Sequence, residues 1–328
     1  MHTRSVSPEL SLSRVVLGTA GFGTSINERD AFVQMDRYYE AGGRTFDTAR
    51  VYGLWAPGGD GASEKCLGKW VRSRGVRDEV VLSTKGAHHD LQDIHHKRVN
   101  PECILRDLAD SLENLGVESV DLYFLHRDDP RIPVPEIMDV LHEQVSAGKI
   151  HALGVSNWTT ARLEEANDYA IRHGKTPFSV SQIEWSFAKL ERQIYGPEDS
   201  TCFMDDESYQ WYTAHRFPVM AYSSQAKGFF TKLVNAPEKV TGLFADVYAT
   251  PVNRRRALRA QTLAEKYGVP VARIALAALL ADPLDGCAII AASSLPQLDD
   301  SLAADGLMLS PEEIRWLYDD FSADSVCK

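Results

Sequence analysis

The sequence Val120-Asp121-Leu122-Tyr123-Phe124-Leu125 is a short, mainly apolar run without strict alternation of polar and apolar residues. Strands that are buried on both faces of a parallel sheet have this pattern. Seven further runs of this kind occur along the chain, and amphipathic segments lie between them. These seven runs are residues 15–17, 44–46, 80–83, 152–155, 180–183, 219–221 and 288–291.

Helix start and stop signals fall between the runs. Asn100-Pro101-Glu102 offers an N-cap with proline at the first helical position, and Ser310-Pro311-Glu312-Glu313 is a capping box. Several glycines follow helical segments, where a left-handed residue often ends a helix. These glycines are Gly42, Gly75, Gly116, Gly148, Gly174 and Gly268. The alternation of strands and helices predicts parallel βαβ units.

Eight such units in 328 residues favour a closed (β/α)8 TIM barrel over two doubly wound halves. The stretch from Gly18 to Gly23 does not match the G-x-G-x-x-G fingerprint, which disfavours a dinucleotide-binding Rossmann domain. Residues 193–206 are polar and irregular, and we interpret them as a loop over the barrel mouth. We predict an α/β fold with one domain over residues 1–328 and extended loops over its C-terminal face.

The composition excludes several classes of protein. A net charge of −11 argues against a nucleic-acid partner, and no apolar run has the length of a membrane span. The N-terminal residues lead into no apolar signal core. The five cysteines are scattered and form no CxxC pair, which fits a reducing compartment. We therefore expect a cytoplasmic protein with no membrane or nucleic-acid partner, whose oligomeric state the sequence leaves open.

Polar residues follow the predicted strands, and in a (β/α)8 barrel the C-terminal strand ends form the active site. From the second strand to the eighth they are Asp47 with Tyr52 five residues later, Lys85, His126, Ser156 with Asn157, Gln182 (which lies within the sixth strand), Tyr222 with Ser223 and Ser224, and Ser293 with Ser294. A barrel with only a structural role would not need these side chains. Taken alone, Asp47 or Lys85 would more often be a surface or salt-bridge residue.

The first four of these residues have complementary chemistry. A lysine ammonium beside a tyrosine stabilises the phenolate, so we expect Lys85 to lower the pKa of Tyr52 from about 10. A buried Lys85 would need a counter-ion, for which Asp47 is the candidate. His126 could orient a substrate oxygen or share the proton. Tyr52 is then the predicted proton donor or acceptor.

Segments around these residues resemble the aldo-keto reductase family, in the family's order. Phe46-Asp47-Thr48-Ala49-Arg50-Val51-Tyr52-Gly53 resembles its catalytic segment, and Val81-Leu82-Ser83-Thr84-Lys85 its lysine strand. Asp121-Leu122-Tyr123-Phe124-Leu125-His126 is similar to its histidine strand, and Gly154-Val155-Ser156-Asn157-Trp158 to its amide-recognition strand. The similarity extends from about Arg14 to Tyr318.

The resemblance implies an NAD(P)H-dependent oxidoreductase that interconverts a carbonyl and an alcohol by direct hydride transfer. It implies a catalytic tetrad of Asp47, Tyr52, Lys85 and His126, with Tyr52 as general acid or base. Ser156, Asn157 and Gln182 would bind the nicotinamide carboxamide, and Tyr222 would stack on the nicotinamide ring. The other residues that we assign to the cofactor are Gly18, Thr19, Asp47, Ser223, Ser224, Gln225, Lys227, Gly228, Ser293, Ser294, Gln297 and Ser301.

The adenosine end departs from the family pattern. Ala291 stands where the family often has a lysine, and Gln297 where it has an arginine that binds a 2′-phosphate. Serines near a helix start can still bind an anion, as Ser293 and Ser294 could. We expect NADP as the cofactor on the family pattern, with NAD as the alternative.

Histidine pairs and tryptophans complete the candidate residues. His88-His89 and His95-His96 lack partners at metal-ligand spacing, so we interpret them as parts of a solvated loop and predict no metal site. Trp55 and Trp158 stand beside predicted site residues, and we place both in the substrate pocket with Tyr52 and His126. The other tryptophans fit core or lid packing.

The substrate and two rival functions stay open at this point. Polar loops combined with Trp55 and Trp158 suggest a sugar or sugar-like carbonyl, while simple aliphatic or aromatic aldehydes fit equally well. One rival is a cofactor-binding regulatory subunit of a larger assembly with little turnover. Another is an aldolase or isomerase barrel in which Lys85 forms a Schiff base.

Overall fold

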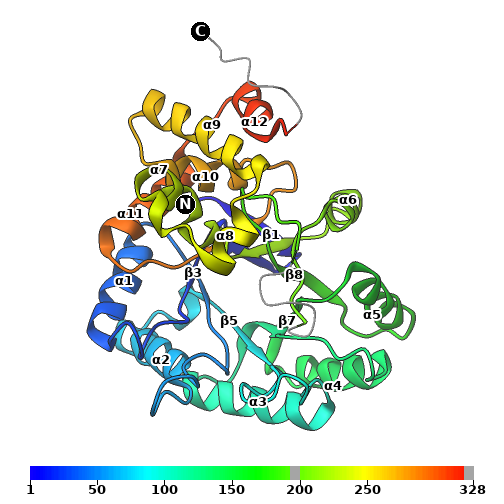
Figure 1. The fold of residues 1–328 in the computed structure, drawn as a ribbon. Helices are drawn as coiled ribbons and strands as arrows, with labels where there is room; N and C mark the ends of the chain where they lie inside the picture. The colour runs from blue at the N-terminus through cyan, green and yellow to red at the C-terminus, as the bar shows by residue number, and fades with distance from the viewer. Residues whose placement is uncertain (193–199, 321–328) are drawn as a thin grey trace.

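The computed structural model describes residues 1–192 and 200–320. Eight parallel strands form a closed barrel in the order β10-β3-β4-β5-β6-β7-β8-β9, and Figure 1 shows helices surrounding it. This arrangement confirms the predicted (β/α)8 fold. The barrel strands are β3 (Val15–Gly18), β4 (Thr45–Asp47), β5 (Val81–Gly86), β6 (Val120–Leu125), β7 (Ile150–Ser156), β8 (Phe178–Glu184), β9 (Val219–Tyr222) and β10 (Cys287–Ile290).

Among the described residues, one α-helix follows each strand from β3 to β8, whereas four α-helices lie between β9 and β10 and two follow β10. The helices are α1 (Glu28–Glu40), α2 (Ala62–Arg74), α3 (Pro101–Leu115), α4 (Val134–Ser146), α5 (Thr160–Arg172), α6 (Asp206–His215), α7 (Phe229–Asn235), α8 (Gly242–Tyr248), α9 (Pro251–Tyr267), α10 (Val271–Leu280), α11 (Leu295–Ala303) and α12 (Pro311–Tyr318). Within the two described ranges, no helix has the length and apolar character needed to cross a membrane.

The sequence signals for the helix ends are confirmed in the structure. The Asn100 side chain accepts a hydrogen bond from the Cys103 amide at the start of α3. Ser310 and Glu313 form the capping box of α12. All six glycines predicted to follow helices have positive φ angles, between 64° and 86°. Left-handed backbone of this kind is where glycine is favoured over residues with a Cβ.

A β-hairpin closes the N-terminal end of the barrel, and the sequence reasoning missed it. Its strands are β1 (Thr3–Ser7) and β2 (Leu10–Ser13), which pair antiparallel. Val6 and Leu12 from this hairpin are buried in a cluster with side chains of the barrel strands. The hairpin therefore covers one end of the apolar barrel interior, and the C-terminal strand ends form the other.

Helices α2 and α3 pack closely at Gly68, which gives a prediction about stability. Glycine-to-alanine changes inside helices usually stabilise a protein. At Gly68 an added Cβ would overlap the carbonyl oxygen of Leu115. We expect Gly68→Ala to lower the free energy of unfolding by about 1–3 kcal/mol, measured by urea denaturation. Lys65→Ala, at an exposed position of the same helix, is the control, and equal stability of the two variants would contradict the prediction.

Candidate active site

Asp47, Lys85 and Tyr52 meet at the C-terminal end of the barrel. The Lys85 ammonium donates to Asp47 Oδ2 at 2.6 Å, to the Thr48 carbonyl oxygen at 2.7 Å and to the Tyr52 hydroxyl oxygen at 3.2 Å. The Lys85 side chain is fully buried and that of Asp47 is 2% exposed. The predicted counter-ion is therefore in place, and the three donors of the ammonium all have acceptors.

The second carboxylate oxygen of Asp47, Oδ1, accepts hydrogen bonds from two side chains. Ser83 Oγ donates to Asp47 Oδ1 at 3.0 Å, and Gln182 Nε2 donates to the same atom at 3.0 Å. Ser83 lies beside Asp47 in the β4–β5 register, while Gln182 reaches across from β8. These hydrogen bonds hold the Asp47 carboxylate in place, and Asp47 in turn holds the Lys85 ammonium beside Tyr52. The position of the ammonium therefore depends on several strands.

The pKa of Tyr52 differs from the sequence expectation. Burial raises it above the ordinary value, and the nearby Lys85 ammonium lowers it only in part. The expected direction was therefore wrong, because desolvation of the phenolate outweighs the attraction of the ammonium. For Lys85, burial lowers the pKa, but Asp47 and Tyr52 together raise it above the ordinary value. Tyr52 is consequently a neutral phenol and Lys85 a cation at neutral pH.

His126 follows β6 and lies beside Tyr52, with the ring centroids 5.8 Å apart and the rings nearly perpendicular. Burial, the neighbouring His88 and the cation of Arg127 hold the pKa of His126 well below its usual range. The imidazole is therefore neutral at neutral pH, so that one ring nitrogen can donate a hydrogen bond and the other can only accept.

A cavity of about 180 Å³ lies between Tyr52 and the ends of β7, β8 and β9. Its wall contains every residue that we assigned to the nicotinamide carboxamide and ring. The residues that line it are Tyr52, His126, Arg127, Ser156, Asn157, Gln182, Glu184, Thr201, Tyr222, Ser223 and Lys227. The catalytic candidates and the nicotinamide candidates thus share one hollow at the barrel mouth.

Asn157 connects several walls of this cavity. Its φ of 62° is in the left-handed region, which asparagine tolerates better than most residues. Asn157 Oδ1 accepts from the Tyr222 hydroxyl at 2.7 Å and from the Cys202 amide at 3.1 Å. Asn157 Nδ2 donates to the His126 carbonyl and to Ser156 Oγ. Cys202 belongs to the segment that we predicted as a loop over the mouth, of which residues 193–199 lie outside the described part.

Part of an unusual turn after β9 consists of residues that we assigned to the cofactor, namely Ser223, Ser224, Gln225, Lys227 and Gly228. Ser223, Ala226, Lys227 and Gly228 all have positive φ angles, between 48° and 77°. Successive residues in such conformations can direct backbone N–H groups to one side and create a concavity that suits an anion. The turn is joined to β10 because Ser224 Oγ donates to the carbonyl oxygen of Ile289 at 2.6 Å.

Other residues that we assigned to the cofactor also come together. Gln225 Nε2 donates to Ser301 Oγ at 3.0 Å, and the Ser293 amide donates to Gln297 Oε1 at 2.9 Å. Ser294 is the N-cap residue of α11 and makes no side-chain capping hydrogen bond.

Gly18 and Thr19 differ from this group because they are packed into the barrel wall. The buried Thr19 hydroxyl contacts Ser63 at 2.8 Å, and a Cβ at Gly18 would crowd Ile289.

The structure separates the two tryptophans that we placed in the substrate pocket. Trp55 is 56% exposed, and its ring centroid lies 6.1 Å from that of Tyr52. Trp158 is 1% exposed, packs against Phe178 and donates from Nε1 to the Arg127 carbonyl oxygen. Placing Trp158 in the substrate pocket was therefore wrong, because its indole fills the core behind the strand end.

The first histidine pair also differs from its prediction. His88 and His89 are 8% and 5% exposed, so they do not belong to a solvated loop, whereas His95 and His96 are exposed. The rings of His88 and His89 are tilted by 46° with their centroids 4.2 Å apart, and His88 packs edge-on against His126 with the centroids 4.7 Å apart. Across the described residues there is no cluster of three or more side chains that could hold a metal ion.

Glu184 is a site residue that the sequence reasoning missed. It ends β8 and lines the cavity, and its buried carboxylate accepts from the Tyr248 hydroxyl at 3.1 Å. Burial raises the pKa of this carboxyl, while the nearby Lys227 lowers it. The period of two in a strand places residues 182 and 184 on the same face, so the assignment of Gln182 could have identified Glu184. Arg127 and Thr201 also line the cavity and were missed by the sequence reasoning.

Comparisons with known proteins agree with this geometry. A model of the Aldo/keto reductase family matches residues 14–318. A norsolorinic acid reductase of Emericella nidulans is 29% identical, over 98% of this chain and 82% of that protein. An aldo-keto reductase of the same organism is 31% identical, over 95% and 77%. An aryl-alcohol dehydrogenase of Phanerodontia chrysosporium, named for NADP(+), is 34% identical over 53% of this chain and 46% of its own length.

Together with the barrel and its polar strand ends, these matches define the class of protein as an NAD(P)-dependent oxidoreductase that acts on carbonyl and alcohol groups. Because the family match covers nearly the whole chain, the protein belongs to the aldo/keto reductase family.

Proposed function

We propose that this protein reduces an aldehyde or ketone with NADPH and that Tyr52 donates the proton. The observation that carries the proposal is the contact of Lys85 with Tyr52 at 3.2 Å, on the edge of a cavity that Tyr222 and Gln182 also line. The phenol, the ammonium and the predicted nicotinamide contacts thus lie within one site. The same groups serve alcohol oxidation when the proton moves the other way.

The residues of this chain fit a nicotinamide dinucleotide. The turn from Ser223 to Gly228 offers a concave run of backbone, and the amide side chains of Asn157 and Gln182 are buried at the cavity wall. These groups would hold the pyrophosphate and the carboxamide, and Tyr222 would pack on the ring. The bound cofactor would supply or accept the hydride at its nicotinamide ring.

The protein groups would act on the oxygen of the substrate. Tyr52 would donate its hydroxyl proton to that oxygen as negative charge develops, and His126 would donate a second hydrogen bond to it. Lys85 would stabilise the phenolate that remains after proton transfer, because its charge lies next to the phenol oxygen. Asp47 would keep Lys85 charged and in place.

Cofactor preference and substrate class are tested by two linked measurements. We expect NADPH to quench the intrinsic fluorescence at lower concentrations than NADH, because the Ser294 N-cap of α11 is free of a side-chain capping bond and can receive a phosphate. A stronger response to NADH would overturn the NADP assignment. A panel of carbonyls is then assayed with the cofactor that binds more tightly.

An aromatic carbonyl is the substrate class that we favour. The relatives named for norsolorinic acid and for aryl alcohols support it, as does the exposed Trp55 indole next to Tyr52. The sugar hypothesis relied on two indoles, and the burial of Trp158 leaves only one. We expect aryl aldehydes to give the highest kcat/KM, and higher values for aldoses would reverse this assignment.

The surroundings of Lys85 argue against the Schiff-base alternative. A nucleophilic amine must be neutral and accessible, whereas Lys85 is fully buried, has three acceptors and has a raised pKa. Borohydride in the presence of substrate is expected to leave Lys85 unmodified. The other alternative, a regulatory subunit with little turnover, predicts cofactor binding without activity on any carbonyl of the panel.

A further inference from the structure

The loop after β5 begins with a strained residue next to the candidate active site. Ala87 is fully buried and has a φ of 58°, in the left-handed region that a residue with a Cβ rarely adopts. Its backbone N–H donates to Asp107 Oδ2 of α3 at 2.8 Å. Backbone strain of this kind persists only where the surrounding structure holds it, and it is concentrated at functional sites.

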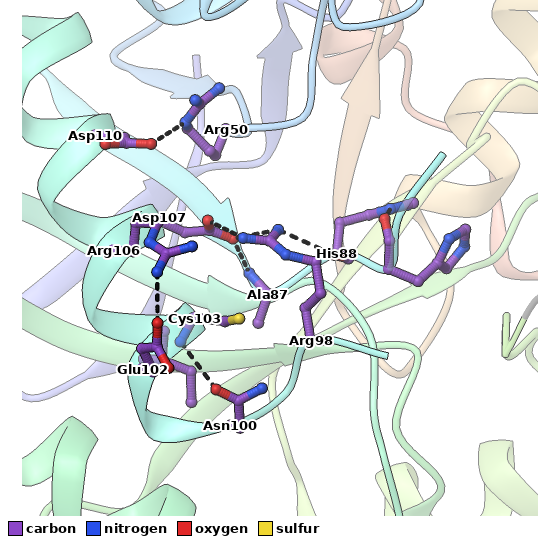
Figure 2. Close-up of polar contacts among 12 residues, drawn as sticks. Arg50, Ala87, His88, Arg98, Asn100, Glu102, Cys103, Arg106, Asp107 and Asp110 are labelled. Carbon is purple, nitrogen blue, oxygen red and sulfur yellow. Dashed lines mark hydrogen bonds and ion pairs between the residues drawn. The ribbon is translucent and has the colours of Figure 1, made fainter. Parts of the chain in front are cut away.

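An ion pair holds the other side of the same loop. Arg98 Nη2 donates to Asp107 Oδ1 at 2.6 Å, and Arg98 Nη1 donates both to Asp107 Oδ2 at 3.0 Å and to the His88 carbonyl oxygen at 3.2 Å. Figure 2 shows the Arg98 guanidinium between Asp107 and His88. The backbone amide of Ala87 donates to the same Asp107 carboxylate. Asp107 therefore fixes the backbone immediately before His88 and, through Arg98, the backbone of His88 itself.

The ring of His88 is fixed as well. Its Nδ1 lies 2.9 Å from the carbonyl oxygen of His89. A carbonyl oxygen only accepts, so Nδ1 of His88 carries the proton. The ring lies between two others, with centroids 4.2 Å from His89 and 4.7 Å from His126. A buried side chain of this kind, held at its backbone and its ring, is suited to position its neighbour.

The neighbour, His126, has a distinctive arrangement of hydrogen bonds. Its Nδ1 is buried, and no described residue hydrogen-bonds to it. A proton on Nδ1 would leave a buried N–H donor unsatisfied, which is more costly than leaving a lone pair unused. His126 also lines the cavity beside Tyr52. The neutral ring therefore favours its proton on Nε2.

We propose that His88 is a positioning residue of this enzyme: its ring, on a backbone anchored by Asp107 and Arg98, packs against His126 and keeps the His126 proton on Nε2 for the substrate oxygen. The inference rests on the proposed function, because it assigns His126 the second hydrogen bond to that oxygen. The His88 ring packs edge-on against the His126 ring, whose Nδ1 is buried, and we infer that this contact helps to keep water from Nδ1. Without His88, water could reach Nδ1 and stabilise the other tautomer.

The charged and titratable groups around His126 come from several elements. They are Lys85 of β5, His88 and His89 of the following loop, Arg127 next to His126 itself, and Tyr52 of the loop after β4. Burial and the neighbouring His88 both lower the pKa of His126. Loss of the His88 ring would reduce that burial and remove the electrostatic effect of His88. The pKa of His126 should then rise towards its ordinary value.

The test uses the full-length protein labelled with ¹⁵N in its histidines, together with steady-state kinetics. His88→Leu removes the ring, and His88→Phe restores an aromatic ring without the hydrogen-bonding nitrogens. His173→Leu is the matched control, because the His173 ring also contacts an aromatic ring, that of Tyr169, and its Nδ1 lies at a backbone carbonyl, but His173 is exposed at the C-terminal end of α5. Thermal melting of each variant verifies folding.

We expect the nitrogen resonances of His126 to show the Nε2–H tautomer in the unaltered protein and a mixture of tautomers in His88→Leu. In that variant kcat should fall about tenfold to 100-fold, while the Kd for NADPH changes less than about twofold, because His88 does not line the cavity. His88→Phe should recover most of kcat. The control should match the unaltered protein in all of these measurements.

Two results would overturn the inference. One is an Nδ1–H tautomer of His126 in the unaltered protein, and the other is a loss of kcat in His88→Phe equal to that in His88→Leu. The tautomer is read from the free protein without turnover. A failure of the proposed function, seen as absence of activity on every carbonyl, is therefore distinguishable from a failure of the role given to His88.

Discussion

Tyr52→Phe is expected to lower kcat for carbonyl reduction by about 10²–10⁴-fold, the range in which a positioned proton donor contributes to catalysis. The substitution removes only the hydroxyl that Lys85 contacts at 3.2 Å. The phenyl ring can keep its edge-to-face contact with His126. The Kd for NADPH, measured by fluorescence, should therefore change little, because the assigned carboxamide contacts and Tyr222 are untouched.

A second tyrosine provides the control for this experiment. The hydroxyl of Tyr169 donates to Asp139 Oδ1 at 2.9 Å, and neither residue lines the cavity. Tyr169→Phe also removes one hydroxyl that bonds to a charged group, and it should retain full activity. If Tyr52→Phe keeps activity near that of Tyr169→Phe, Tyr52 is not the proton donor.

The fold could be predicted from the sequence because its signal is repeated along the chain. Each of the eight apolar runs overlaps a barrel strand, and the run from Val120 to Leu125 coincides with β6. The hairpin of β1 and β2 gives a weaker signal, since Val6 and Leu12 are the only buried apolar residues of a largely polar segment. The hairpin packs against the end of the closed barrel, so its position depends on the tertiary structure. The local sequence pattern contains no information about this packing.

The candidate site could be predicted where residues lie at strand ends, because the strand register alone brings those residues together. Individual exposure was less predictable: Trp55 and Trp158 both lie near site residues in sequence, but one is exposed and the other fills the core. The direction of the Tyr52 pKa was wrong for a related reason. The lysine was visible in the sequence, whereas the larger effect of burial depends on all the elements packed around the phenol.

Lys85→Met is expected to change both the rate and its dependence on pH. Tyr52 must be protonated for reduction, so that activity should be constant through neutral pH and fall only as the pH rises through the Tyr52 pKa, which burial raises. Alcohol oxidation needs the phenolate and should rise with pH through the same pKa. Lys85 is the main group that lowers this pKa. Its removal should therefore move the rise in oxidation to higher pH.

The same substitution leaves a buried carboxylate without its cation, and this separates catalysis from stability. Removing one partner of a buried ion pair costs about 3–5 kcal/mol, so Lys85→Met should lower the free energy of unfolding by roughly that amount. In Lys85→Met/Asp47→Asn the charge at Asp47 is absent, while Ser83 and Gln182 remain near its side chain. We expect the double variant to recover much of the stability, measured by urea denaturation, but none of the activity. If it recovers both, Lys85 and Asp47 serve only to stabilise the barrel, and Tyr52 does not depend on the ammonium for proton transfer.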